Sequence, residues 1–329
     1  MKYLKTIGMI NNLAIERGFL GPGSTALSSD GRIFVLDCYH YTGGVFRITV
    51  QDFDENFLFE FASSQGDKTG DKIFKNPSDL EFDSEDKLYV TDEILNAVLM
   101  YDSQGNFHGQ WGDSGSKEGE LSGPSGIAID SKDDLFIVDQ YNHRIQKFTK
   151  EGKFLYAWGN FGSKEGEFNL PWGICVDKND DIYVADWRND RIQKFSNEGK
   201  FLDSFVSGGG IFIRPSDVVV DSIGTIYVSD WGNERVVALN SSGEFIFSER
   251  GNSDSITEWT KEFFESNTDE RDTRAIANLV PDLPEELQTP YHISSQSEPL
   301  FWGVTDLTID SQDRLFVTEH RRHRLQIFV

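Results

Sequence analysis

Short hydrophobic runs separated by polar turns recur along most of the chain. Residues 126–159 contain four of them in succession, GIAID, LFIVD, RIQKF and KFLYAWG, with Gly, Asp, Asn or Lys-rich turns between them. Runs of this length, rich in Ile, Val and Phe and bounded by turn residues, are typical of β-strands joined by hairpins. The runs show no helical periodicity. We therefore predict a four-stranded antiparallel unit, whose strands we call a, b, c and d in chain order.

The same unit repeats six times. Its strand b ends on an acidic residue, and the successive spacings are 55, 47, 47, 44 and 89 residues, at Asp37, Asp92, Asp139, Asp186, Asp230 and Glu319. One such unit cannot bury both of its faces, whereas radial stacking of several units buries them against their neighbours. The chain is therefore predicted to be all-β, a six-bladed β-propeller of four-stranded antiparallel blades forming one domain over residues 1–329. The long last spacing leaves room for an insertion at 252–300 between blades 5 and 6.

The two ends of the chain are expected to close the ring. The last unit stops at RLQIFV, residues 324–329, without a strand d. Residues 2–8, KYLKTIG, match the strand-d pattern of residues 153–159. We expect the N-terminal strand to complete the last blade and to protect its edge.

Several segments resemble the NHL repeat. The c-strand segments 142–148, 186–195 and 322–326 are similar to its most characteristic part, and 123–130 and 171–177 to its beginning. The resemblance covers nearly the whole chain except about 252–300 and implies a six-bladed propeller. It leaves the function open, because NHL propellers include RNA-binding and protein-binding modules and peptide-amidating lyases, and virginiamycin-lyase propellers are similar in architecture. No position matches a catalytic motif of these enzymes.

The net charge of the chain limits the classes of partner that it is expected to bind. With 31 basic and 55 acidic side chains the net charge is -24. Such a chain repels phosphate backbones, so we expect no nucleic-acid partner, and cations or basic groups become favoured ligands. A solvated acidic surface would explain the charge equally well. RNA binding as in tripartite-motif NHL proteins needs a basic rim, for which only Arg188, Arg321 and Arg322 are available.

The cysteines and the N-terminal sequence are used to predict the cellular compartment of the protein. Cys38 and Cys175 fall in blades 1 and 4, on opposite sides of the predicted ring, so a disulfide between them is not expected. Two separate thiols fit a reducing compartment. We see no signal peptide and no apolar stretch near ~18 residues, so no membrane partner is expected and the predicted location is cytoplasmic.

Strand a should line the central channel. Four residues before the Asp that ends strand a, the six units read Ala26, Asp79, Gly126, Gly173, Asp217 and Asp306. We predict that Asp79, Asp217 and Asp306 converge at one rim as a metal site, where oxygen ligands suit Ca²⁺ or Mg²⁺ better than Zn²⁺. The alternative is that each Asp caps its own turn and the channel holds water.

The b–c loops should open on the same rim and carry most of the candidate ligand-binding residues. Together with Trp172 at the start of a strand a, they are His40, Tyr41, Glu93, Tyr141, Trp187, Arg188, Trp231, His320 and Arg321. Exposed aromatic side chains around a concave mouth are a common way to hold a ligand. Trp187 and Trp231 occupy equivalent positions in adjacent blades and are predicted to stack, the alternative being packing between blades. His40, His292 and His320 offer a Zn²⁺ alternative, although their spacing does not require one.

A structural role is predicted for the arginines that follow strand b. Arg144, Arg191, Arg235 and Arg324 stand five residues after the acidic residue, across the b–c turn. We predict that each acidic side chain pairs with its arginine and braces the turn.

The insertion is expected to be partly helical. A capping box at 255–258 begins a helix through Phe264, and a second helix is predicted over 269–279. A link from strand d to the next strand a emerges at the rim where strand a begins, so we predict a partial lid carrying His292, Glu298 and Trp302. A clamp across two blades is the alternative.

Two functions remain open on the sequence alone. The first is a binding scaffold that recognises a peptide, a small molecule or a protein partner at the channel mouth. The second is a metal-assisted lyase or hydrolase with its active site on the same rim. The sequence contains no phosphate-binding loop, nucleophile elbow or zinc-helix motif, and it leaves the oligomeric state open.

Overall fold

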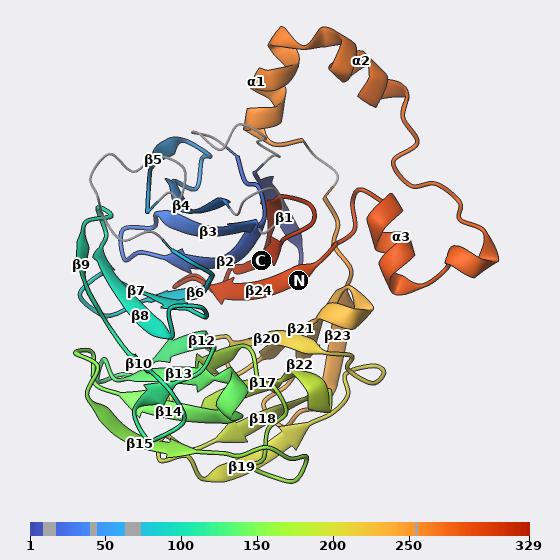
Figure 1. Cartoon of the computed structure of the whole chain (residues 1–329). Coiled ribbons are helices and arrows are strands. Elements are labelled where there is room, and N and C mark those ends of the chain that lie inside the picture. The colour runs from blue at the N-terminus through green and yellow to red at the C-terminus, as the bar shows by residue number, and fades with distance from the viewer. Residues whose placement is uncertain (9–17, 40–44, 63–73, 254–255) are drawn as a thin grey trace.

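The computed structural model describes residues 1–8, 18–39, 45–62, 74–253 and 256–329 and is a six-bladed β-propeller. The chain forms six four-stranded antiparallel sheets, the blades. Figure 1 shows them following one another around the molecule in chain order. The predicted fold class is confirmed. The first three blades are formed by β2 (Pro22–Leu27), β3 (Ile33–Tyr39), β4 (Val45–Gln51) and β5 (Phe57–Phe61); β6 (Pro77–Phe82), β7 (Lys87–Asp92), β8 (Ala97–Asp102) and β9 (Phe107–Trp111); and β12 (Pro124–Ile129), β13 (Leu135–Asp139), β14 (Arg144–Phe148) and β15 (Phe154–Trp158).

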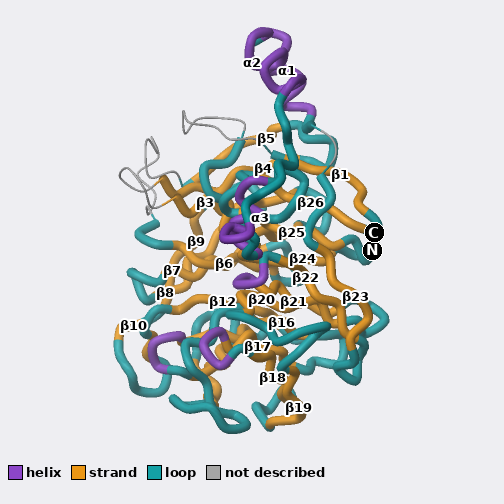
Figure 2. Tube along the Cα trace, turned by 90° about the vertical axis from the view of Figure 1, so that its right-hand side faces the viewer, coloured by secondary structure: helices purple, strands orange, loops and turns teal. Residues whose placement is uncertain are grey.

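The remaining blades repeat this order, and the last one closes the ring. They are formed by β16 (Ile174–Val176), β17 (Ile182–Asp186), β18 (Arg191–Phe195) and β19 (Phe201–Phe205); β20 (Pro215–Val220), β21 (Ile226–Asp230), β22 (Arg235–Leu239) and β23 (Phe245–Glu249); and β24 (Val304–Ile309), β25 (Leu315–Glu319), β26 (Arg324–Phe328) and β1 (Tyr3–Ile7). The Lys2 amide donates to the Val329 carbonyl over 2.6 Å, and the two chain ends lie side by side in Figures 1 and 2. The predicted closure by the N-terminal strand is confirmed.

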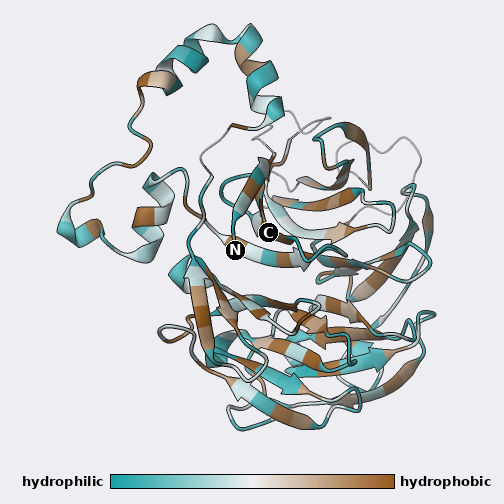
Figure 3. Ribbon diagram, turned by 180° about the vertical axis from the view of Figure 1, so that it is seen from behind, coloured by the Kyte–Doolittle hydropathy of each residue, from teal (hydrophilic) through white to brown (hydrophobic). Residues whose placement is uncertain are grey.

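Side chains that alternate along the strands pack one blade against the next. Between blades 1 and 2, the rings of Phe34 and Phe82 lie 4.8 Å apart and join a buried cluster that includes Leu88 and Tyr101. Figure 3 shows hydrophobic residues concentrated in the strands, while α2 of the insertion is largely hydrophilic. The core is thus a set of layers between radial sheets.

The innermost strands β2, β6, β12, β16, β20 and β24 line the central channel. We call the rim where these strands begin, and where the b–c turns lie, the mouth rim. Three b–c turns form short 3-10 helices, η1 (Gln140–Asn142), η2 (Trp187–Asn189) and η3 (Trp231–Asn233). A parallel pair of β10 (Asp113–Ser114) and β11 (Glu120–Leu121) lies in the link from blade 2 to blade 3. None of the described helices has the length and apolar character needed to cross a membrane.

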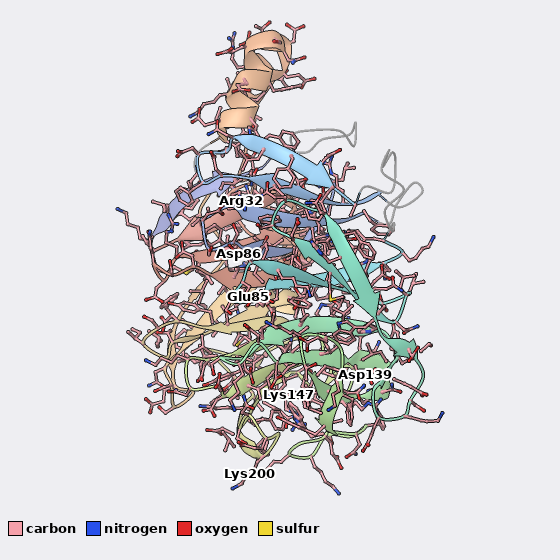
Figure 4. All side chains as sticks on the ribbon, turned by 90° about the vertical axis from the view of Figure 1, so that its left-hand side faces the viewer. Arg32, Glu85, Asp86, Asp139, Lys147 and Lys200 are labelled. Atoms are coloured by element: carbon pink, nitrogen blue, oxygen red, sulfur yellow. The ribbon has the colours of Figure 1, made fainter. Side chains whose placement is uncertain are left out.

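The far rim, at the a–b turns, is fastened by serine–aspartate contacts between blades. Ser29 of blade 1 donates its amide to Asp86 of blade 2 over 2.8 Å, and its hydroxyl also donates to that carboxylate. Asp86 lies between Arg32 and Glu85 in Figure 4. The same contact joins Ser84 to Asp133, Ser131 to Asp180 and Ser222 to Asp313. These repeated contacts hold the blades in register at the end of the channel opposite the mouth.

The insertion forms α1 (Glu258–Ser266), α2 (Thr268–Ile276), η4 (Glu285–Leu287) and α3 (Pro290–Gln296). The predicted helices are confirmed with small shifts: Thr257 caps α1, and Ser255 lies outside the described residues. Trp259 is buried between blades 6 and 1, where its indole N–H donates to the Glu55 carbonyl. Figures 1 and 2 show α1 and α2 projecting beyond the sheets, whereas α3 lies against η3 on the mouth rim. A lid role stays a prediction, and α3 is the part placed to serve it.

Candidate functional site

Buried ion pairs support the turns of the mouth rim. The predicted acid–arginine pairs are confirmed, with Nε to carboxylate distances of 2.7, 2.8, 2.7 and 2.7 Å for Arg144, Arg191, Arg235 and Arg324. Burial raises the pKa of Asp139, Asp186 and Asp230, although their hydrogen bonds act against this. These carboxylates brace the turns and are not exposed for binding.

In blades 1 and 2 the acidic residue at the end of strand b has other partners. In blade 1, Asp37 pairs with Arg47 of strand c at 3.0 Å, and both side chains are fully buried. In blade 2, Ala97 stands where the other blades have the arginine, and Asp92 accepts the amide hydrogens of Lys75 at 2.7 Å and Leu95 at 2.9 Å instead. The irregularity seen in these two blades therefore leaves their turns supported.

Asp79, Asp217 and Asp306 line one small void inside the channel, which we call the neck. Each carboxylate accepts an amide hydrogen from the innermost strand of the next blade: from Ile127 at 2.9 Å, from Leu307 at 2.8 Å and from Thr25 at 3.0 Å, respectively. These contacts tie blade 2 to blade 3, blade 5 to blade 6 and blade 6 to blade 1.

The position assigned to blade 1 was wrong. Pro22 pairs with Asp37 as Pro77 pairs with Asp92, so Ser24 and not Ala26 is equivalent to Asp79. Ser24 donates its hydroxyl to Asp79 at 2.5 Å and to Asp306 at 3.2 Å. The alignment slipped because Ser28 occupies the turn position that an Asp holds in the other blades.

The neck is less negative than its residue count suggests. Burial raises the pKa of Asp79 to about 6. Burial, reinforced by the charges of neighbouring carboxylates, raises the pKa of Asp217 and of Asp306 well above the usual range. Burial and the charge of Asp79 raise the pKa of Glu81, two residues further along the strand, to about 7. At neutral pH these groups share protons.

The predicted metal site gains no support. In the part of the chain that the structure describes, no group of three or more His, Cys, Asp or Glu side chains is placed to hold a metal ion. The reason is that Asp79, Asp217 and Asp306 each direct an oxygen to a neighbouring strand. The capping alternative describes them better, although they cap the next blade and not their own turn. The Zn²⁺ alternative also gains no support. The His292 ring forms a hydrogen bond with the Thr289 hydroxyl at 2.7 Å, whereas His320 lines a pocket at the mouth rim.

A pocket of about 190 Å³ opens at the mouth rim above this neck. It collects residues from blades 1, 2, 4 and 6: Gly23, Cys38, Asn76, Pro77, Ser78, Glu93, Trp172, Thr305 and His320. We call it the mouth pocket. Three predicted residues, Glu93, Trp172 and His320, thus lie around one hollow. On the other side of the neck, a cavity of about 360 Å³ runs to the far rim and is lined by Glu81 and Cys175 among others.

The carboxylate of Glu93 is held in place. Asn76 donates its side-chain amide to Glu93 at 2.5 Å, and the Tyr141 hydroxyl donates to the other oxygen. That hydrogen bond to a carboxylate raises the pKa of Tyr141 to about 12. Glu93 is therefore a fixed acceptor at the edge of the mouth pocket.

Trp172 continues the pocket wall toward η2. Its side chain is 38% exposed, and its ring centroid lies 6.3 Å from that of Trp187. The guanidinium groups of Arg188 and Arg214 lie 5.2 and 5.1 Å from the Trp187 ring. The predicted stack of Trp187 on Trp231 was wrong: among the described residues the aromatic neighbour of Trp187 is Trp172, and the turn containing Trp231 supports α3.

The remaining predicted residues form a second group. The Trp302 ring lies 6.1 Å from Tyr291 and beneath the guanidinium groups of Arg321 at 5.6 Å and Arg322 at 5.4 Å. His292 lies at the far side of Tyr291, with ring centroids 5.6 Å apart. His292, Trp302 and Arg321 are thus brought together around α3. His40 and Tyr41 lie outside the described residues.

Sequence reasoning missed Arg214, Asn76 and Glu81. Glu81 could have been found, because it lies two residues after Asp79 and so shares its face of the strand. Arg214 and Asn76 lie in the links from strand d to the next strand a. The repeat pattern does not predict which residues of these links reach the mouth rim.

A comparison with protein families matches the NHL repeat at residues 121–148 and 168–195. No curated protein matches the chain. Among solved structures, a streptogramin B lyase is similar with a TM-score of 0.59 and 13% identity, covering 100% of this chain and 98% of the other. Virginiamycin B lyase from Staphylococcus aureus gives 0.60 and 12%, covering 99% and 98%. A protein of unknown function from Bacteroides thetaiotaomicron gives 0.61 and 14%, covering 99% and 72%. At these identities the likeness is one of fold.

Proposed function

The chain is a six-bladed β-propeller of NHL repeats, and on this premise we propose that it is a ligand-binding scaffold whose binding site is the mouth pocket. The observation that carries the proposal is the pocket itself, a hollow that joins the partly exposed Trp172 to the fixed carboxylate of Glu93. Concave sites with an aromatic wall and a few oriented polar groups are those that proteins use for small ligands. The ring geometry supports this role because residues far apart in sequence meet there.

The volume of the mouth pocket limits the size of the group that can bind in it. At about 190 Å³ the pocket holds a small molecule or a single side chain or terminus of a peptide. A larger partner would reach it with one projecting group and rest on the surrounding turns.

Catalysis is the weaker candidate. A metal-assisted lyase or hydrolase on this rim needs a set of converging ligands, and the described residues do not gather one. The similarity to lyases is one of fold and transfers no active-site residue. We therefore propose ligand binding as the first function and keep the metal-assisted enzyme as the second candidate.

A fragment screen by ligand-observed NMR tests the proposal. Ser78 lies in the mouth pocket, so Ser78→Trp should fill it. Ser241→Trp places the same side chain on an exposed turn of blade 5 and serves as the control. We expect fragments that bind the wild type and S241W and fail to bind S78W, with unchanged circular dichroism. Binding of the same fragments to all three proteins would place the site elsewhere.

A further inference from the structure

Two arginines from different segments meet on one indole beside the mouth pocket. Arg188 belongs to η2, and Arg214 precedes β20, yet their guanidinium groups lie 5.2 and 5.1 Å from the Trp187 ring. Both side chains are exposed. The chain has thus placed two guanidinium groups beside one indole at its mouth rim, although its net charge is -24.

Within the described part of the chain, neither guanidinium is neutralised by a carboxylate. The arginines that follow strand b in the same turns, such as Arg191 and Arg235, form ion pairs with buried aspartates. Among the described residues, Arg188 and Arg214 have no such ion pair and no side-chain hydrogen bond. The nearby carboxylate of Asp190 accepts the backbone amide of Arg214 at 2.7 Å. Among the described residues, the guanidinium donors of both arginines are therefore left available to a ligand.

A guanidinium stacked on an indole keeps its N–H donors free at the edge of its plane. Those donors match the two oxygens of a carboxylate or the oxygens of a phosphate. The ring attracts the cation and limits its motion, so less freedom is lost when an anion binds. A bound anion would also be attracted by the charges of both arginines.

The arginine pair is connected to the mouth pocket. Trp187 contacts Trp172 at 6.3 Å, and Trp172 lines the pocket. We propose that Arg188 and Arg214 form an anion subsite of the mouth pocket, and that the ligand is an organic anion whose apolar part lies against Trp172. This inference rests on the proposed function and names the chemistry of its ligand. The negative group is a carboxylate or a phosphate.

The test uses three phenyl compounds that differ in charge. Benzoate, phenyl phosphate and the neutral benzamide are titrated into the full chain, with binding followed by tryptophan fluorescence and ligand-observed NMR. The variants are Arg188→Gln with Arg214→Gln, and the single Arg188→Gln. Arg271→Gln is the control, because Arg271 is exposed on α2 and already paired with Asp272.

We expect the wild type and R271Q to bind benzoate or phenyl phosphate about tenfold more tightly than benzamide, since charge-assisted hydrogen bonds add to the apolar contact. The double variant should lose this preference, and R188Q should retain part of it. The stronger of the two anions identifies the source of the negative group.

An anion preference that persists in the double variant, or equal binding of benzamide and both anions to the wild type, would overturn the subsite. If benzamide still binds in a manner lost in S78W, the mouth pocket itself would stand. If no compound shows binding that S78W removes, both proposals fail.

Discussion

Two tryptophans on the mouth rim each lie near two guanidinium groups, but their surroundings differ. We call Trp187 with Arg188 and Arg214 the open cluster, and Trp302 with Arg321 and Arg322 the closed cluster. In the closed cluster, Arg322 donates to the Ser294 carbonyl of α3 at 2.7 Å, and Tyr291 of the same helix packs on Trp302. In the open cluster, both arginine side chains are exposed.

The insertion accounts for this difference. It supplies α3 to blade 6 and gives blade 4 no equivalent, so the same residue types brace a helix in one place and remain available to a ligand in the other. Arg250 adds to the closed cluster by donating to the Ser294 hydroxyl at 3.0 Å. The contrast shows that residue type alone does not separate a structural arginine from a binding one.

The largest effect should come from removing Trp302, and Trp187 is the matched comparison. Trp302→Ala deletes a side chain packed between Tyr291 and two arginines and should lower the free energy of unfolding by about 2–3 kcal/mol. Trp187→Ala should cost less than about 1 kcal/mol, since the two arginines beside it are exposed and hold no helix in place. Urea denaturation followed by circular dichroism gives both values. Equal losses would erase the distinction between the clusters.

A pH-dependent contribution should arise beside the closed cluster, at Glu234, which binds the residue that follows Trp302. Glu234 is 3% exposed, accepts the Gly303 amide at 2.7 Å and has its pKa raised to about 7 by burial. Because that pKa is above the ordinary value for Glu, its protonated form stabilises the fold below about pH 4.5. This stability is lost as the pH rises through 7.

Glu234→Gln keeps the acceptor and removes the titration. At pH 8 it should be more stable than the wild type by an amount on the order of 2 kcal/mol, and the difference should shrink toward pH 5. Thermal denaturation across this range measures it. A variant less stable than the wild type at pH 8 would contradict the assigned pKa direction.

Smaller effects should follow from the arginines. Arg322→Gln removes the bond to Ser294 and should cost about 1 kcal/mol and expose residues 277–300 to limited proteolysis. Arg188→Gln should change stability by less than about 0.5 kcal/mol and leave the cleavage pattern unchanged. Identical proteolysis of both variants would show that Arg322 does not hold α3.

The fold was predictable because each blade repeats the same sequence pattern. Strand boundaries, the acid–arginine pairs and the closure by residues 2–8 all followed from that repetition. Errors arose where a blade departs from it: Ser28 in place of Asp shifted the alignment of blade 1. Equivalence in the repeat also suggested a Trp187–Trp231 contact, whereas Trp187 packs on Trp172 of its own blade.

The insertion and the d–a links have no second copy in the sequence to compare. The burial of Trp259 between blades 6 and 1 depends on which surface the insertion reaches, and a helical pattern alone does not specify that. Arg214 was not predicted for the same reason, because it lies in one of the d–a links. The repeat pattern placed Glu93, Trp172 and His320 on the mouth rim, where they line one pocket, but it did not specify the contacts between them. That this pocket binds a ligand stays a proposal.

A crystal structure of the chain soaked with benzoate would show where the anion binds. We expect the benzoate ring against Trp172 in the mouth pocket, with its carboxylate between Arg188 and Arg214. Benzoate bound in the far-rim cavity beside Glu81, or at the closed cluster with the mouth pocket empty, would contradict it.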